Sequence, residues 1–299
     1  MATPSSQMTV AVVGPGAIGT VLAAALRERG LAPSLHGRTA RGHLELIVDD
    51  ERIQVPGPVR TDPQQAHGPV DLVFLAVKAT QIADAAPWLA ALCGAETVVC
   101  VLQNGVEQVA SIEPLAQGAD VLPAVVWFPA QRQEDGAVWL RGQARLTVPD
   151  GDAGRRVADA LRDTLCSVEL SDAFASLAWR KLLQNAVAGL MALTGRRSGM
   201  FRRSDIAELS LAYLRECLAV ARAEGAVLDD AVPDEILAAF QTYPEDLGTS
   251  ILADRDAGRP LEWDIRNGVI SRLARTHGIP TPISDAVAAL LAATSDGPG

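Results

Sequence analysis

A short apolar strand that leads through a glycine-rich turn into an apolar helix constrains this chain more than any other feature. Residues 10–13 (VAVV) suit a buried strand of a parallel sheet. The following GPGAIG places Gly14, Gly16 and Gly19 in a G-x-G-x-x-G pattern, and apolar residues at helical spacing then run on to Gly30. This order predicts a dinucleotide site, in which the first N–H groups of the helix face a pyrophosphate. A glycine turn that binds nothing is the alternative.

The end of the second predicted strand, residues 33–36, indicates which dinucleotide is bound. Sites that prefer NAD usually have an acidic residue here for the ribose 2′-hydroxyl, but the first acid beyond this strand is Glu45. The sequence HGRTAR instead offers Arg38, Thr39 and Arg41, which suit a 2′-phosphate. The pattern therefore favours NADP, unless the two arginines are ordinary surface residues.

Alternating strands and helices continue through the first half of the chain. The apolar runs at 71–79 and 97–105 predict buried strands, with an apolar helix through Trp88 between them. Lys78 and Asn104 stand near the ends of these strands, and ligands of open α/β sheets bind beyond the carboxyl ends of the strands. We therefore expect both residues to reach a cofactor or substrate, although each also suits a simple turn.

The pattern as a whole predicts an α/β protein in which an N-terminal Rossmann-like dinucleotide-binding domain is followed by an all-helical C-terminal domain. Two β-rich runs, at 120–128 and 137–148, look like an antiparallel addition to the sheet. From about Asp172 onward the periodicity is helical. We therefore expect an NADP-binding domain at residues 8–171 and a substrate and catalytic domain at residues 172–299.

The first helix of the second half, predicted over residues 173–193, carries two polar residues where a core helix has none. Lys181 and Asn185 are four residues apart and share one face, while apolar residues recur on another. Gly189 continues the polar face and leaves room for something to lie against it. A lysine is costly to bury without a partner, so it either serves a site there or extends to solvent.

A later stretch, residues 250–282, contains two further polar candidates. Pro260 suits the first position of a helix predicted at 261–276, with Glu262 in its first turn, where the helix dipole favours an acid. Ser250 suits an N-cap. From spacing alone, these structural roles are the simplest interpretations.

Composition excludes several classes of protein. The formal net charge of −10 argues against a nucleic-acid-binding surface, which would be basic. The N-terminus lacks the basic and apolar regions of a signal peptide, and no apolar stretch is long enough to span a membrane, so we expect a cytoplasmic protein. The histidines show no metal-ligand spacing and the four cysteines form no C-x-x-C pair, so we expect no metal site and buried, unpaired cysteines.

Together these stretches resemble the ketopantoate reductase family, the NADPH-dependent 2-dehydropantoate 2-reductases, over nearly the whole chain. The joint order and spacing of the motifs is far more specific than any one of them. The motifs that carry the resemblance are GPGAIG at 14–19, Arg38 after the second strand, VKA around Lys78, QNG around Asn104, WRKLLQN at 179–185, and S-x11-E from Ser250 to Glu262.

The resemblance implies reduction of 2-dehydropantoate (ketopantoate) to pantoate by NADPH, as in pantothenate biosynthesis, in a cleft between the two domains. It implies that Lys181 is the general acid and also a substrate contact. The other substrate-binding residues that it implies are Asn104, Asn185 and Ser250. The cofactor-binding residues that it implies are Gly14, Pro15, Gly16, Ala17, Ile18, Gly19, Arg38, Lys78, Asn104, Ala130 and Glu262.

One departure from the family pattern leaves the substrate open. Where the family often has a second substrate-binding asparagine, this chain has Gly189, which leaves space for a water molecule or for a bulkier substrate. The alternatives are a reductase of another 2-oxo acid, a reductase of C=N bonds, and a non-catalytic NADP-sensing protein. Of these, the NADP sensor has no use for Lys181 in an apolar cleft. The expected partner is a small 2-oxo acid, and a homodimer stays open.

Overall fold

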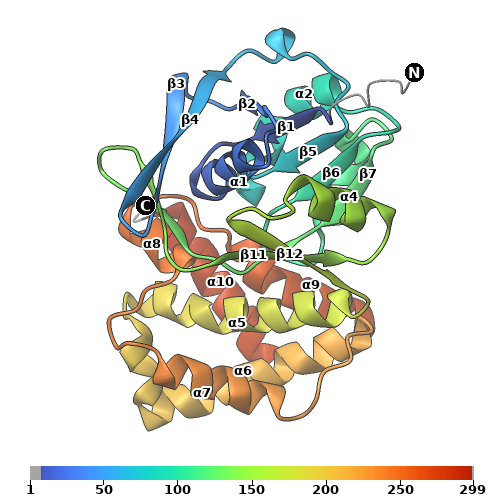
Figure 1. Cartoon of the computed structure of the whole chain (residues 1–299). Coiled ribbons are helices and arrows are strands. Elements are labelled where there is room, and N and C mark those ends of the chain that lie inside the picture. The colour runs from blue at the N-terminus through green and yellow to red at the C-terminus, as the bar shows by residue number, and fades with distance from the viewer. Residues whose placement is uncertain (1–7, 298–299) are drawn as a thin grey trace, which may run out of the picture. The chain divides into compact units, whose positions relative to one another are not determined.

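The computed structural model describes residues 8–297, which form two compact units (Figure 1). The first unit comprises residues 8–103 and 107–174, and the second comprises residues 104–106 and 175–297. The short segment 104–106 therefore belongs to the second unit, although the chain on either side of it belongs to the first. Contacts between this segment and the helices of the second unit are internal to that unit.

A nine-stranded sheet forms the centre of the first unit, in the order β7-β6-β5-β1-β2-β4-β3-β10-β9. The strands from β7 to β4 in this order run parallel. Beyond them β3 is antiparallel to β4, β10 is parallel to β3, and β9 is antiparallel to β10. The strands are β1 (Val10–Val13), β2 (Ser34–His36), β3 (Arg41–Val48), β4 (Glu51–Arg60), β5 (Leu72–Leu75), β6 (Val98–Val101), β7 (Asp120–Pro123), β9 (Ala130–Arg132) and β10 (Val138–Leu140).

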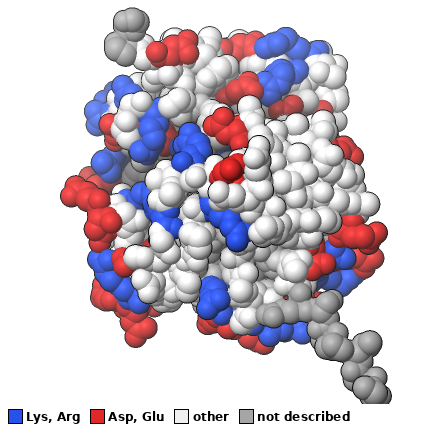
Figure 2. Space-filling view, turned by 90° about the horizontal axis from the view of Figure 1, so that it is seen from above, with Lys and Arg blue, Asp and Glu red and all other residues white. Residues whose placement is uncertain are grey.

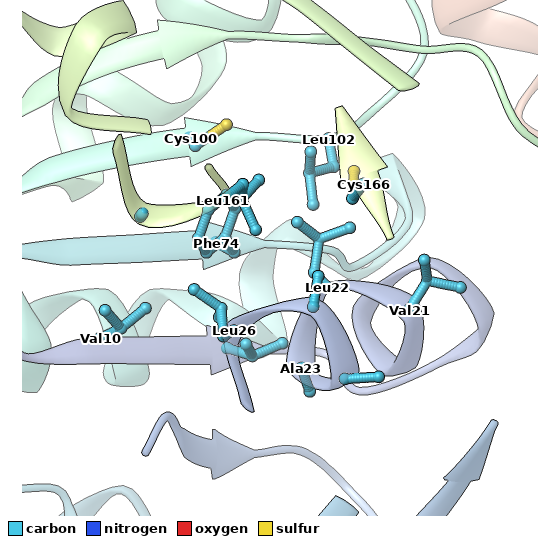
Figure 3. Packing of buried hydrophobic residues seen from close by; sticks show 14 of the residues in the cluster. Val10, Val21, Leu22, Ala23, Leu26, Phe74, Cys100, Leu102, Leu161 and Cys166 are labelled. Atoms are coloured by element: carbon cyan, nitrogen blue, oxygen red, sulfur yellow. The ribbon is translucent and has the colours of Figure 1, made fainter. Parts of the chain in front are cut away.

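Helices cover both faces of the parallel strands, which explains why those strands are apolar throughout. Side chains alternate between the two faces of a strand, so Val10 and Val12 pack with α1 while Ala11 and Val13 pack with α2. Figure 3 shows Leu22 of α1 in the first of these layers, with residues from β5, β6 and β12. The α-helices of this unit are α1 (Ala17–Glu28), α2 (Ile82–Leu92), α3 (Gln108–Ile112) and α4 (Asp152–Ala160), with short 3-10 turns η1 (Pro63–Gln65), η2 (Ala79–Gln81) and η3 (Glu113–Leu115).

A second, three-stranded sheet has the order β12-β11-β8, with β8 (Val125–Val126), β11 (Ala144–Pro149) and β12 (Cys166–Ser171). The expected antiparallel addition is found in part: β11 is antiparallel to β8, and β10 is antiparallel to β9. The expectation is wrong for β7, which extends the main sheet in parallel, and for the other side of β10, which is parallel to β3. Each of the two predicted runs is divided between the two sheets, and strand periodicity carries no information about the partner that a strand will have.

The second unit is helical. Its elements are α5 (Phe174–Thr194), η4 (Ser198–Arg202), α6 (Ser204–Ala223), α7 (Val232–Thr242), α8 (Ser250–Asp256), the π-helical turn η5 (Asp264–Gly268), α9 (Val269–His277) and α10 (Pro282–Asp296). On α5 the residues Leu183, Val187 and Leu190 are buried, as their spacing predicts, in a core that includes Tyr213 and Phe201. The core side of this helix is therefore distinct from the side that carries Lys181 and Asn185.

The start of the predicted helix at 261–276 needs correction. Helical backbone begins at Trp263 and passes through the π-helical turn, so Pro260 and Glu262 precede the helix instead of standing in its first turn. Ser250 is the first residue of α8, and the N-cap of that helix is Thr249. The N-cap role of Ser250 is therefore wrong, and Glu262 stands directly before the helix instead of in its first turn.

The structure also bears on the expected state of the cysteines, the distribution of surface charge and the possibility of a membrane span. All four cysteines are buried and unpaired, as expected, and burial raises the pKa of Cys93 to about 11. Figure 2 shows the surface from above, where the described Lys and Arg side chains form small groups with Asp and Glu side chains among them. Within residues 8–297, no helix combines the length and the apolar composition needed to cross a membrane.

Candidate active site

The turn between β1 and α1 is built so that two of its glycines cannot carry a side chain. Gly14 has φ +86°, and a Cβ there would lie 2.6 Å from Cγ1 of Val77. A Cβ on Gly19 would lie 2.5 Å from the carbonyl oxygen of Gly14. Because these glycines have no Cβ, the first turn of α1 can lie close to the sheet, as the G-x-G-x-x-G pattern requires in a dinucleotide site.

Gly16 has open space where the other two glycines have none. A Cβ there would meet no atom nearer than 3.9 Å among the described residues. Gly16 precedes the first residue of α1, and its carbonyl oxygen accepts hydrogen bonds from the backbone N (3.0 Å) and Oγ1 (2.7 Å) of Thr20. A phosphate can therefore approach the backbone at Gly16, which follows Pro15 and stands directly before Ala17 and Ile18, the first two residues of α1. The turn fits a dinucleotide pyrophosphate.

Arg38 stands beyond the end of β2, as predicted, but it has an acidic neighbour that the sequence did not reveal. Its Nη1 lies 3.9 Å from Oδ2 of Asp84 on α2, and both side chains are largely exposed. An exposed ion pair of this kind contributes little to stability. Arg41 begins β3. The pKa of Arg132 is lowered mainly by burial of Arg132 itself and, second, by the positive charge of Arg41. Asp84 is thus a counter-charge for Arg38, while Arg41 and Arg132 lie close enough to repel each other.

The remaining cofactor candidates of the first unit occupy strand ends and a sheet edge. Lys78 follows β5 and is the N-cap of η2, in a capping box with Gln81. The side-chain Nε2 of Gln103, just beyond β6, donates a hydrogen bond to the carbonyl oxygen of Val77 (3.1 Å), which ties these two strand ends together. Ala130 is the first residue of β9 and packs against the core under α1.

Lys181, on α5 in the second unit, lies in surroundings that disfavour its charge. Burial lowers its pKa from 10.5 to about 8, and the positive charge of Arg266 contributes to the lowering. A lysine with a pKa near 8 is protonated at neutral pH yet gives up its proton far more readily than a surface lysine does. This is the property that a proton donor needs.

Asn185, one turn along α5, is the centre of a chain of hydrogen bonds. Its Nδ2 donates to Oδ1 of Asn104 (3.1 Å), and its Oδ1 accepts from Nη2 of Arg266 (3.1 Å). Nη1 of Arg266 donates in turn to Oγ of Ser250 (3.1 Å). Three residues predicted to bind substrate, Asn104, Asn185 and Ser250, are thus joined in one network, and Arg266 connects them.

Arg266 is the residue that the sequence analysis missed. It is 2% exposed, and burial lowers its pKa while the negative charges of Glu262 and Asp254 oppose that effect. The signal for it was available: Arg266 falls on the apolar stripe that continues through Ile270 and Leu273, where a charged residue is unexpected. Glu262 is itself buried, at 8% exposed.

The space beside Gly189 is filled by protein, which corrects the expectation of an open notch. A Cβ on Gly189 would lie 2.8 Å from Nδ2 of Asn267 and 3.0 Å from Cδ1 of Leu291. Nδ2 of Asn267 donates to the carbonyl oxygen of Ala186 (2.9 Å) and to the hydroxyl of Tyr213 (2.9 Å). Neither a water molecule nor a bulky substrate is needed to explain this glycine, because it lets η5 approach α5.

The cluster in the second unit suits one kind of chemistry. Lys181 can give a proton to an oxygen on which negative charge develops, and Asn104, Asn185 and Ser250 can hydrogen-bond the neighbouring oxygens of the same molecule. Within residues 8–297, no group of acidic, histidine or cysteine side chains is arranged to hold a metal ion.

Comparison with known proteins identifies the family. The family model "Ketopantoate reductase PanE/ApbA" matches residues 10–153, and "Ketopantoate reductase PanE/ApbA C terminal" matches residues 173–295. The chain belongs to the ketopantoate reductase family. It is therefore an oxidoreductase that acts on a CH–OH/C=O group, with the mixed α/β and helical architecture of that family.

Relatives match over almost their full length. The 2-dehydropantoate 2-reductase of Mycobacterium tuberculosis (strain H37Rv) is 56% identical over 97% of this chain and 99% of the relative. That of Caulobacter vibrioides is 36% identical over 96% of this chain and 99% of the relative. Among solved structures, the dimeric ketopantoate reductase of Staphylococcus aureus is 27% identical with a TM-score of 0.88, and the match covers 98% of this chain and 100% of that one.

Proposed function

We propose that this protein reduces ketopantoate to pantoate with NADPH, and that Lys181 is the proton donor. The observation that carries the proposal is a lysine whose pKa is lowered to about 8, on the same helix as the hydrogen-bonded Asn185. The relatives named 2-dehydropantoate 2-reductase supply the substrate. The proposal also adopts residues 8–171 as the NADP-binding domain and 172–299 as the catalytic domain.

Reduction of a ketone requires a proton as well as a hydride. The nicotinamide ring, when bound, supplies the hydride to the keto carbon. Lys181 holds the proton at Nζ, stabilises the negative charge that grows on the keto oxygen, and then transfers the proton to that oxygen. The N–H groups of Asn185 and Asn104 and the hydroxyl of Ser250 orient the keto acid by hydrogen bonds to its oxygens.

The dinucleotide is assigned to the glycine-rich turn, with the pyrophosphate over Gly16, where a Cβ would find open space. We assign Lys78 and Asn104 to the nicotinamide end, and Ala130 and Glu262 to further cofactor contacts. These assignments extend the family resemblance residue by residue.

The preference for NADPH rests on the chemistry at the end of β2. Arg38 and Arg41 stand where an NAD site usually has an acid for the ribose 2′-hydroxyl. A 2′-phosphate beside Arg41 would also relieve the repulsion between that residue and Arg132. Asp84 opposes this preference by pairing with Arg38, but its ion pair is exposed and easily exchanged for a phosphate.

An oligomeric state and a compartment complete the proposal. The dimeric Staphylococcus aureus relative supports a homodimer for this chain. A cytoplasmic location is part of the same proposal, in keeping with the enzyme family of the relatives.

A substrate panel tests the proposal. NADPH oxidation by the purified protein would be followed with ketopantoate, with other 2-oxo acids of smaller and larger side chain, and with a cyclic imine, each also with NADH. We expect ketopantoate and NADPH to give the highest kcat/KM. If another 2-oxo acid gives a higher kcat/KM, that acid is the substrate and the proposed mechanism still holds. Reduction of the imine alone would indicate a C=N reductase. Binding of NADPH without turnover of any compound would overturn the enzymatic proposal.

A further inference from the structure

Arg266 fixes the direction of every hydrogen bond in the substrate cluster. A guanidinium group only donates hydrogen bonds, so each atom that it contacts must act as an acceptor. Its two acceptors are Oδ1 of Asn185 and Oγ of Ser250, both at 3.1 Å. The orientation of these two groups is therefore fixed. A flipped amide on Asn185 would point its own N–H groups at the N–H groups of Arg266.

The constraint passes from Asn185 to Asn104. With its oxygen held by Arg266, the amide of Asn185 must point its Nδ2 away, and that nitrogen donates to Oδ1 of Asn104 (3.1 Å). Asn104 must then present its own Nδ2 elsewhere. Each amide keeps N–H groups for a further partner, while both amide oxygens are already engaged by other groups of the network.

The same logic applies to Ser250. Its oxygen accepts from Arg266, which leaves the hydroxyl hydrogen to be donated to another group. The side chains of Asn104, Asn185 and Ser250 therefore all offer hydrogen-bond donors. A carboxylate and a ketone have only acceptor oxygens, so this arrangement complements a 2-oxo acid.

We propose that Arg266 is a positioning residue that makes Asn185, Asn104 and Ser250 donors, and that this polarity selects 2-oxo acids over uncharged analogues. The inference rests on the proposed function, because it assumes that these three residues contact the substrate. Arg266 itself does not touch the substrate in this account. Its Nε is buried and has no hydrogen-bond partner among the described residues, so the fold retains a costly buried cation whose donors are not all satisfied.

The charge of Arg266 has a second consequence, for Lys181. The charged groups around Arg266 are Lys181 from α5, Asp254 on α8 and Glu262 before η5, and Asp254 is also paired with Arg259 (2.9 Å). The positive charge of Arg266 disfavours protonation of Lys181. Removing that charge should therefore let Lys181 keep its proton to higher pH.

The test compares a keto acid with its primary carboxamide, which has nearly the same shape but places an N–H donor where the acid has an oxygen. The acid is ketopantoate, or whichever 2-oxo acid the wild-type protein reduces best. The variants are Arg266→Met, Arg266→Gln and Arg266→Lys, and the control is Arg272→Met, an exposed arginine of the same helical segment that pairs with Asp264. Thermal unfolding and NADPH binding would show which variants are folded.

We expect Arg266→Met and Arg266→Gln to reduce the preference for acid over amide about tenfold, mainly through KM for the acid, while NADPH binding is unchanged. The alkaline fall in kcat/KM should move to higher pH in the same two variants. Arg266→Lys, which keeps a cation and donors, should retain the wild-type pH dependence and part of the preference. Arg272→Met should behave as wild type.

The outcomes separate this inference from the proposed function. Equal loss of activity toward acid and amide, with no shift of the pH profile, would mean that Arg266 is only structural. If Arg266→Met does not fold, the Gln and Lys variants decide, and identical preferences in both would overturn the inference. A wild-type protein that reduces no 2-oxo acid would instead overturn the proposed function.

Discussion

Gly189 on α5 and Asn267 of η5 approach so closely that a Cβ on the glycine would lie 2.8 Å from Nδ2 of the asparagine. The asparagine uses this proximity to donate to the carbonyl oxygen of Ala186 and to the hydroxyl of Tyr213. The absence of a side chain at Gly189 is therefore a requirement of helix packing. The lack of a second asparagine on this face does not enlarge the substrate site.

Replacing this glycine should damage the fold. Gly189→Asn would force Asn267 and Leu291 to move, and we expect a loss of about 1–3 kcal/mol in the free energy of unfolding, as for other overpacked cores. Gly42→Ala on β3 is the control, since nothing lies within 4 Å of its Cβ position. Denaturant unfolding measures both. A Gly189→Asn protein that is as stable as wild type and turns over ketopantoate faster would contradict this packing role and indicate open space beside Gly189.

The glycine-rich turn allows stability and binding to be separated. Gly19→Ala places a Cβ 2.5 Å from a carbonyl oxygen and should cost about 1–3 kcal/mol of stability. Gly16→Ala has open space and should change stability by less than about 1 kcal/mol, while hindering the approach of the pyrophosphate. We expect its Kd for NADPH to rise about tenfold or more. Calorimetric titration with NADPH would show this, and unchanged affinity in Gly16→Ala would place the dinucleotide elsewhere.

Cofactor preference should depend on Arg38 and its neighbour Asp84. Arg38→Ala should weaken NADPH binding by about 1.5–3 kcal/mol, the value of a charged hydrogen bond, and leave NADH binding nearly unchanged. Asp84→Asn should act in the opposite direction on NADPH, because it removes the anion that lies 3.9 Å from Arg38. The Kd values of both cofactors decide the matter. Equal losses for NADPH and NADH in Arg38→Ala would exclude a 2′-phosphate contact.

The lowered pKa of Lys181 should also appear in the stability of the protein. Since its pKa falls from 10.5 to about 8 on folding, the unfolded chain binds more protons between these values, and stability should rise with pH across this window. Lys181→Met removes this dependence and should be more stable than wild type at pH below about 8. Arg180→Met is the control, because an arginine does not titrate there. Identical pH dependence of unfolding in wild type and Lys181→Met would contradict a buried, shifted lysine.

Local patterns were sufficient for the first part of the site. The predicted strand at Val10–Val13, the positive φ of Gly14 and the helix that ends before Gly30 follow from neighbouring residues alone, and Gly30 has φ +85°. The same holds for the buried face of α5. In each case a residue type and its spacing impose a backbone conformation, whatever the rest of the chain does.

Long-range pairings could not be found in this way. Nothing in the sequence near Arg38 indicates that Asp84 approaches it. The strand patterns likewise do not show that β7 is parallel to β6 or that β10 is parallel to β3. The packing of Asn267 against Gly189 likewise joins residues that are distant in the chain. Arg266 is different, because a charged residue on an apolar stripe, four residues after Glu262, is visible in the sequence itself.

The central claim is that Lys181 gives the proton in an NADPH-dependent reduction of a 2-oxo acid. The most direct measurement is the single-turnover rate of NADPH oxidation in the presence of saturating ketopantoate, for wild type and for Lys181→Met, with NADPH affinity measured separately. The account predicts a rate lower by about 10²–10⁴-fold in the variant, as for other general acids, with NADPH bound as tightly as in wild type. A single-turnover rate within a few-fold of wild type would contradict it, because the proton would then come from another group.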